Sequence, residues 1–207
     1  MRGAPAHDER MEPINPTRER ILVAAAELLR RHGPAKTTVT DVARALGMSH
    51  ANVYRHFASK AALRDAVAER WLHSISTPLA PIAAGPGSAA DRLRAWVLAL
   101  AEAKRRKIHD DPELFATYHA VADQARDVIT EHMVTLRAQL AQILRDGMAN
   151  GEFAAADPDA TAAAIFDATI RFHHPQHVRE HAGRSVELEA GRVVALLLAG
   201  LRAGTAP

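Results

Sequence analysis

The feature that most constrains this chain is a pair of short helical patterns separated by a tight turn around Gly47. In the first pattern apolar residues recur at helical spacing, and Thr38 with Asp41 three residues later forms a capping-box pair. Gly47 supplies the left-handed backbone position that ends such a helix. Ser49 caps a second helix only two residues later. Two helices joined by so short a turn predict a helix-turn-helix.

The second helix of this pair is expected to have an apolar face and a polar face. Ala51, Val53 and Phe57 are expected to face inward. The outward positions are polar or aromatic, namely His50, Asn52, Tyr54, Arg55 and His56. The second helix of a helix-turn-helix enters the DNA major groove, where contacts to base edges provide sequence specificity. Asn52 has paired donor and acceptor atoms that suit adenine, and Ala51 can contact a thymine methyl group.

A specific run of residues extends this pattern on both sides. It comprises Gly47-Met48-Ser49, then Tyr54-Arg55-His56-Phe57, then Ser59-Lys60 with Leu63 three residues on, preceded by Ile21, Ala25, Ala26, Leu28 and Gly33. Over residues 17–65 the chain resembles the tetracycline-repressor (TetR/AcrR) family of bacterial transcriptional regulators. The resemblance implies that His50, Asn52 and Tyr54 face the major groove, with Ser49 and Ala51 near its entry. Tyr54, Arg55 and His56 are candidate phosphate contacts.

Lys60 is a further candidate for DNA contact. It occupies the first position of a helix, where its charge opposes the helix dipole by about 0.3–1 kcal/mol. A DNA phosphate bound by Lys60 and the free amides at this helix start would offset that cost. Thr38 and Thr40, at the start of an earlier helix, can reach the same DNA backbone. The alternative is that Thr38 is only a helix cap and Lys60 only a surface lysine.

Further helical patterns fill the rest of the chain, and no strand pattern or internal repeat is present. Residues 1–15 are predicted to be a mobile arm, 16–64 the helix-turn-helix domain and 65–207 a helical domain for effector binding and dimerisation. Gly33-Pro34 is expected to end the first helix, and Pro81 to Ser88 to form a loop. Later helices are expected at 88–108 (ended by the basic run Lys104 to Lys107), from Asp110 onward, at 126–150, at 157–173 and at 186–201. The predicted fold is all-α, with about nine helices.

The charge distribution agrees with a chain that meets nucleic acid at one end. The net charge of +2 divides into +5 over residues 1–64 and −3 over the remainder. A basic module on an acidic body is expected where only one end contacts phosphates.

Other features exclude several classes of protein. The chain has no cysteine, no run of 18 apolar residues and no apolar core in its first residues that a secretory signal would need. We therefore expect a cytoplasmic protein without a membrane span. No nucleophile–base pattern, glycine-rich phosphate loop or paired-carboxylate site indicates an enzyme, and no cofactor is predicted.

The C-terminal part is expected to form a homodimer and to bind a small molecule. The last two long helices are the candidate dimer interface, because one is rich in alanine and the other, with Val193, Val194, Leu196, Leu197, Leu198 and Leu201, is apolar nearly all round. In the family that the chain resembles, this domain holds a pocket between helices. The large or polar-tipped candidates for its lining are Trp71, Trp96, Phe115, Tyr118, His119, Phe166 and Phe172. Each of these can also be an ordinary core residue.

The chain has twelve histidines, and four of them lie within nine residues: His173, His174, His177 and His181. If the segment stayed helical, three of them would share a face with spacing that can bind zinc or nickel. Pro175 lies within the run and is expected to break the helix. Structural, pocket-lining and metal-binding roles therefore stay open, and no metal site is predicted.

Together these patterns predict a homodimeric DNA-binding regulator, in particular a repressor released from a palindromic operator by a small, partly apolar effector. The alternatives are an activator or an effector-independent DNA-binding protein of the same fold. A metal-responsive regulator or an enzyme has less support.

Overall fold

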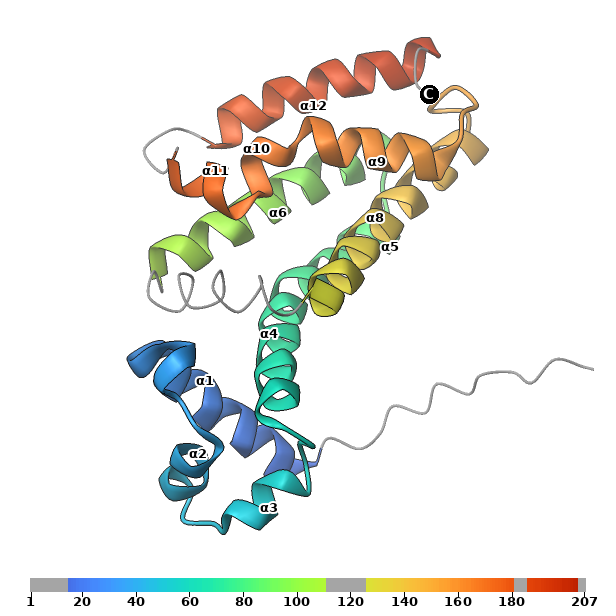
Figure 1. Ribbon diagram of the computed structural model, residues 1–207. Coiled ribbons are helices and arrows are strands. Elements are labelled where there is room, and N and C mark those ends of the chain that lie inside the picture. The colour runs from blue at the N-terminus through green and yellow to red at the C-terminus, as the bar shows by residue number, and fades with distance from the viewer. Residues whose placement is uncertain (1–14, 111–125, 181–185, 205–207) are drawn as a thin grey trace, which may run out of the picture. The chain divides into compact units, whose positions relative to one another are not determined.

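Figure 1 shows a computed structural model of the chain, which describes residues 15–110, 126–180 and 186–204. All regular structure in these ranges is helical, and none of them contains a strand, which confirms the all-α class. The chain forms two compact units, Met1–Leu63 and Arg64–Pro207, here called the N-terminal and C-terminal units.

The N-terminal unit contains α1 (Pro16–Lys36), α2 (Val39–Ala45) and α3 (His50–Tyr54). Asn15 begins α1 by accepting hydrogen bonds from the backbone N–H groups of Thr17 and Arg18 at 3.1 and 3.3 Å. The helices are held together by buried apolar side chains at helical spacing, namely Ile21, Leu22, Ala25, Leu29, Val39, Val42, Val53 and Phe57.

Gly33 kinks α1 where the sequence predicted that the helix would end. Its φ of 73° and ψ of 167° are non-helical, yet the helix resumes and continues to Lys36. Pro34 follows the kink, and proline is tolerated in a first helical turn because its missing N–H would have had no partner there. The buried Thr37 then ends the helix, with its Oγ1 donating to the carbonyl oxygens of Gly33 and Leu28 at 2.9 and 3.1 Å.

The turn between α2 and α3 has the chemistry that the sequence predicted. Thr38 and Asp41 form a reciprocal capping box: the Asp41 N–H donates to Thr38 Oγ1 at 3.2 Å, and the Thr38 N–H donates to Asp41 Oδ2 at 3.0 Å. Gly47 adopts a φ of 63°. Ser49 caps α3 by accepting from the Asn52 N–H at 3.2 Å. The predicted helix-turn-helix is confirmed.

The helix α4 (Lys60–Ser76) begins after Ser59, whose Oγ accepts from the Ala62 N–H at 3.0 Å. A 3-10 turn, η1 (Thr77–Leu79), and a short helix, α5 (Ala80–Ala84), follow it. The loop predicted for Pro81 to Ser88 is therefore wrong for its first half. Prolines in η1 and α5 occupy first-turn positions that tolerate them, and Ala83 of α5 is buried in the core.

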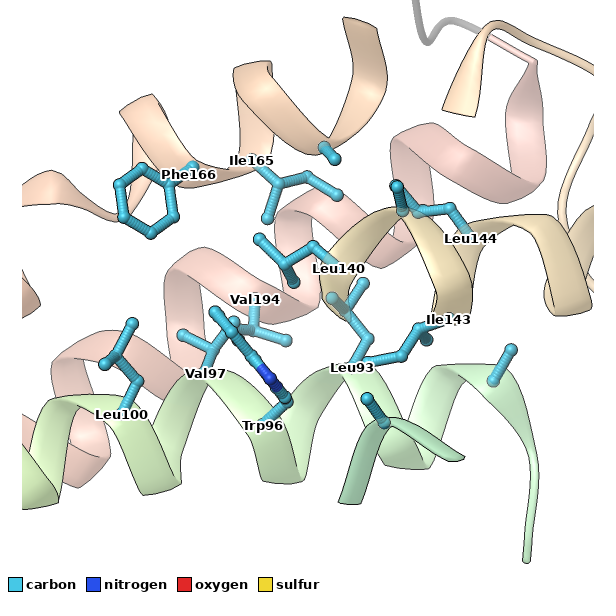
Figure 2. Packing of buried hydrophobic residues seen from close by; sticks show 14 of the residues in the cluster. Leu93, Trp96, Val97, Leu100, Leu140, Ile143, Leu144, Ile165, Phe166 and Val194 are labelled. Atoms are coloured by element: carbon cyan, nitrogen blue, oxygen red, sulfur yellow. The ribbon is translucent and has the colours of Figure 1, made fainter. Parts of the chain in front are cut away.

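The core of the C-terminal unit forms around α6 (Ala89–Asp110) and α8 (Arg126–Ala149). Figure 2 shows Leu93, Trp96, Val97 and Leu100 of α6 packing with Leu140, Ile143 and Leu144 of α8, with Ile165 and Phe166 on one side and Val194 on another. All four α6 residues are buried. The helix predicted to begin at Asp110 lies largely outside the described residues.

Residues distant in sequence tie these helices together through polar contacts. The buried Arg92 donates from Nη1 to the Ala83 carbonyl oxygen and to Asp146 Oδ2, both at 2.8 Å. The Glu152 carboxylate accepts from the first backbone N–H groups of α6, on Ala89 and Ala90, at 2.9 and 3.2 Å. The helix start and the α5–α6–α8 junction are therefore held by partners from elsewhere in the unit.

The last part of the chain forms α9 (Pro158–Ala168), α10 (Ile170–His173), α11 (Pro175–Glu180) and α12 (Val186–Ala203). The single helix predicted for 157–173 is interrupted at Thr169, whose φ is −100° and ψ 5°. Its Oγ1 donates to the Ile165 and Phe166 carbonyl oxygens at 2.8 and 3.2 Å, which satisfies acceptors at the helix end. His174 is extended and separates α10 from α11.

Candidate DNA-binding surface and interior polar cluster

The helix α3 presents a polar surface over a buried apolar one. Val53 and the following Phe57 are buried, whereas Ser49, His50, Tyr54 and Arg55 are exposed. The rings of His50 and Tyr54, one helical turn apart, meet edge to face with centroids 4.7 Å apart. This contact preorganises two aromatic, hydrogen-bonding side chains on the outer face of a short helix.

Ala51 corrects one expectation for this helix. It was predicted to face inward, but it is exposed. Five residues form barely more than one turn, so only Val53 and Phe57 contribute to the buried side. The exposed methyl group of Ala51 is compatible with its proposed thymine contact.

Asn52 and His56 are half-buried at the edges of the exposed face. The amide Nδ2 of Asn52 lies 3.7 Å from Met48 Sδ, a weak donor–acceptor pair across the turn. On the other side, the Arg18 guanidinium lies 5.0 Å from the Phe57 ring centroid and links α1 to the end of the motif. The contacts with Met48 and Arg18 therefore hold the polar face of α3 in place.

The threonines at the start of α2 differ in what their hydroxyls can do. Thr38 Oγ1 donates its hydrogen to Asp41 Oδ2 at 2.6 Å, so it can donate to a phosphate only by giving up this bond. These hydrogen bonds from Thr38 lower the pKa of Asp41 below its ordinary value. Thr40 is exposed, which makes it the freer candidate for a phosphate contact.

Lys60 is exposed at the first position of α4 and forms no ion pair with any residue that the structure describes. Arg55 is likewise exposed. Lys60 and Arg55 are therefore available to an anion.

The candidates for the effector pocket have different environments. Trp96 is buried, and its Nε1–H donates to Gln139 Oε1 at 2.9 Å, so it has a complete structural role in the core. Phe166 and Phe172 are buried, and Trp71 is half-buried against the core. Phe115, Tyr118 and His119 lie outside the described residues.

Two interior side chains, Lys104 and His132, are buried although the sequence did not predict a role for either of them. Lys104, expected in an exposed basic run at a helix end, is only 6% exposed. His132 of α8 is buried to the same degree, and neither of its ring nitrogens has a hydrogen-bond partner among the described residues. A lysine at the helical spacing of the buried residues Trp96, Leu100 and Ala101 was the available signal, because it lies on the same face of α6.

The histidine-rich segment does not form one helical face. His173 is buried and its Nε2 lies 3.0 Å from the Phe166 carbonyl oxygen, while its ring stacks on Phe166 with centroids 4.2 Å apart. His174 and His177 contact each other through their rings, and His181 lies outside the described residues. Across the described ranges, no group of three metal-ligating side chains is close enough to hold an ion.

The ion pairs near this segment also differ from expectation. Asp167 and Arg171, four residues apart, would share one face if residues 157–173 formed the single helix that the sequence predicted. Instead, Arg171 contacts Glu189 of α12 at 2.9 Å, and Asp167 lies 3.9 Å from Arg137 of α8. The break at Thr169 separates the two expected partners.

The two candidate dimerisation helices, α9 and α12, each bury one face and expose another. Val194, Leu198 and Leu201 of α12 are buried, whereas Leu196 is 75% exposed and Leu188 is 56% exposed.

No helix in the described ranges combines the length and apolar character needed to cross a membrane.

Comparisons with protein families agree with this architecture. The model for bacterial regulatory proteins of the tetR family matches residues 21–67, and the model for the tetracyclin repressor-like C-terminal domain matches residues 89–194. The chain belongs to the tetR family of bacterial regulatory proteins. It is a DNA-binding transcriptional regulator rather than an enzyme.

Individual relatives show how far the similarity extends. The chain is 31% identical to the nucleoid occlusion factor SlmA of Cronobacter sakazakii over 155 residues, which cover 72% of this chain and 76% of SlmA. The fatty acid degradation regulator FadR of Bacillus halodurans superposes with a TM-score of 0.67 at 18% identity, covering 92% of this chain and 99% of FadR. FadR of Bacillus subtilis, whose structure was solved with stearoyl-CoA, superposes with a TM-score of 0.65 at 17% sequence identity. The match covers 88% of this chain and 98% of that FadR. At these identities the two solved structures show a shared fold.

Proposed function

We propose that this protein is a homodimeric repressor that a small, partly apolar effector releases from a palindromic DNA operator. One observation carries the proposal: the exposed polar face of α3 lies over the buried Val53 and Phe57, in the geometry of a helix that enters a major groove. Tetracycline-repressor-like matches over both units support it. Such a regulator would act on the chromosome in the cytoplasm.

The DNA contacts divide by chemistry. His50, Ala51 and Asn52 are proposed to contact base edges, with Ser49 at the entry of the groove. Tyr54, Arg55, His56 and Lys60 are proposed to hold phosphates, with Thr40 and, less directly, Thr38 on the neighbouring backbone. All of these side chains are exposed or half-buried.

A dimer is required because one helix-turn-helix covers too few base pairs for tight specific binding. We propose that α9 and α12 form its interface. Leu196, 75% exposed on α12, is the apolar side chain that a second copy would cover. Leu196→Glu should therefore yield monomers in sedimentation velocity, whereas Glu187→Gln on the same helix should not.

Release by an effector would work by population shift. The effector binds the C-terminal unit better in a conformation whose two DNA-binding units no longer match the half-sites, and it must prefer that form by several kcal/mol to switch occupancy fully. FadR of Bacillus subtilis was solved with stearoyl-CoA, which supports a partly apolar effector for this fold.

The first test is selection of bound genomic fragments by the purified protein, repeated at higher salt. A salt-resistant palindromic site is the expected result. Tyr54→Ala should abolish binding to that site while the protein stays dimeric, and Tyr54→Phe should show how much of the effect belongs to the hydroxyl. Normal operator binding by Tyr54→Ala would refute the assigned DNA surface.

A second candidate is an effector-independent DNA-binding protein of the same fold, since the name of the relative SlmA describes nucleoid occlusion and not release by an effector. Mapping the bound sites across the genome separates the two. A few promoter sites whose occupancy falls with metabolite extract indicate an effector-controlled repressor. Many dispersed sites that no extract affects indicate the second candidate.

A further inference from the structure

Lys104 is a buried lysine that has no counter-ion among the residues that the structure describes. It lies on α6, is 6% exposed, and forms no hydrogen bond or ion pair with any part of the chain that the structure describes. The half-buried Trp71 of α4 has its ring centroid 5.9 Å from the Lys104 Nζ. Burying an ammonium group without a paired anion is costly. A perturbed ionisable group in the interior of a protein is therefore a candidate for a functional site.

His132 extends this unpaired polar region. It comes from α8, which packs against α6, and both of its ring nitrogens are buried without a hydrogen-bond partner in the described ranges. A neutral imidazole offers one donor and one acceptor. Buried polar groups in native proteins are nearly always satisfied, so an unsatisfied imidazole beside an unpaired ammonium calls for a specific explanation.

The charges around these two groups are positive or neutral. Burial lowers the pKa of His132 to about 3, and the nearby charges that lower it further are those of Lys104, His73 and His173. Asp167 is the acidic group whose charge affects His173, but it is 68% exposed and lies 3.9 Å from Arg137. The interior thus holds the Lys104 ammonium, two buried imidazoles and no buried carboxylate among the described residues.

We propose that the C-terminal unit binds a monoanionic carboxylate with an apolar body, whose negative charge pairs with Lys104 and which accepts a hydrogen bond from His132. The inference rests on the proposed function, because it assigns a chemical class to the effector. A single buried ammonium balances one negative charge, which favours a carboxylate over a phosphate dianion. The apolar body follows from the surroundings, since Trp71, whose ring centroid is 5.9 Å from Lys104 Nζ, and Met133, which follows His132 in α8, both pack on the apolar core.

The test measures binding to the full-length protein without DNA, by calorimetry. The probes are straight-chain carboxylates from hexanoate to tetradecanoate, each below its micelle concentration, with the primary alcohol and primary amine of the same length as matched controls. We expect at least one carboxylate to bind about tenfold or more tightly than its alcohol and amine, the usual gain from a charge-assisted contact. The alkyl phosphate of the same length tests whether the site accepts a dianion, and we expect it to bind less tightly than the carboxylate.

Variants assign the contact to Lys104. Lys104→Met should weaken carboxylate binding about tenfold or more, and His132→Phe should weaken it less. Lys107→Met, on the same helix but only half-buried, is the matched control and should bind normally. Far-ultraviolet circular dichroism and thermal unfolding check that each variant folds; methionine is apolar and similar in length to lysine, so Lys104→Met is expected to be stable.

Three results would overturn the proposal: no carboxylate of the series binds, alcohols bind as tightly as carboxylates, or the folded Lys104→Met variant keeps full carboxylate affinity. Its failure is distinguishable from failure of the proposed function. A carboxylate that binds through Lys104 but leaves operator binding unchanged would refute effector-controlled release alone. An extract that releases the operator equally from the parent protein and from Lys104→Met would refute the Lys104 assignment alone.

Discussion

The N-terminal and C-terminal units handle polar side chains in opposite ways. In the N-terminal unit the functional candidates are on the surface. The contacts that position them join residues three or four apart, as the hydrogen bonds of Thr38 with Asp41 and the ring contact of His50 with Tyr54. In the C-terminal unit the notable polar side chains are inside, and their partners are distant in sequence, as Arg92 with Asp146. Exposed groups remain solvated, whereas buried groups need partners that the fold must supply.

The two kinds of interaction contribute differently to the free energy of unfolding. Local caps and surface pairs contribute modestly because water already satisfies their members in the unfolded chain. Buried contacts between distant segments are costly to disrupt because the remaining partner stays unsatisfied. The following predictions test that difference, in order of decreasing effect.

Loss of a buried long-range contact should have the largest effect. Arg92→Met leaves Asp146 and the Ala83 carbonyl oxygen without their donor, and we expect the free energy of unfolding to fall by about 3 kcal/mol. Arg44→Met removes an exposed pair with Asp41, at 3.2 Å within α2, and should cost about 0.5 kcal/mol or less. Urea unfolding of both variants measures the two values. Similar values would contradict the contrast between the units.

The buried histidines should make the C-terminal unit sensitive to acid. Burial lowers the pKa of His132 to about 3 and that of His173 to about 4, from an ordinary value of 6.5. The unfolded chain therefore binds protons at these histidines more readily than the folded chain does. Stability should be fully retained above about pH 6.5 and should fall as the pH decreases towards 4, by about 1–3 kcal/mol for each histidine.

This acid sensitivity can be assigned with variants. His132→Leu should flatten the dependence of unfolding free energy on pH between 6.5 and 4, measured by urea unfolding at a series of pH values. His50→Leu, which replaces an exposed histidine of α3, should keep the slope of the parent protein. An unchanged slope in His132→Leu would show that other groups cause the acid sensitivity.

Removal of the α2 cap should have an intermediate effect. Thr38→Ala removes the hydroxyl that accepts the Asp41 N–H, and we expect a loss of about 1 kcal/mol in unfolding free energy. Thr38→Ser keeps the hydroxyl and should restore most of that stability. If alanine and serine at this position are equally stable, the capping box contributes little.

Lys60 should affect DNA binding with the smallest change in free energy. As a proposed phosphate contact without an ion pair in the described ranges, Lys60→Met should weaken operator binding and reduce the slope of log affinity against log salt by about 1, with no loss of sequence preference. Titration of labelled operator at several salt concentrations measures this slope. A lost sequence preference would indicate base contact, and an unchanged slope would indicate a surface lysine.

Most of the N-terminal unit was determined by the sequence itself. Thr38, Gly47, Ser49 and Ser59 act within three or four residues of their own positions, so their caps and turns are visible as spacings. The all-α class and the buried stripe of α6 were predictable for the same reason, because helical periodicity is a local property. Ala51 was misplaced because α3 has only five residues, too few for periodicity to define a face.

Only the tertiary structure decided the interior of the C-terminal unit. Three features depend on what the rest of the unit packs against them: the interruption at Thr169, the short helix Ala80–Ala84 and the pairing of Arg171 with Glu189. Lys104 belongs to a run of basic residues that looks like a solvated helix end, and His132 is an isolated histidine in a long helix. Burial is a property of the packed helices together. Helical spacing places Lys104 on the buried face of α6, but only the fold brings it near His132, whose ring nitrogens have no hydrogen-bond partner among the described residues.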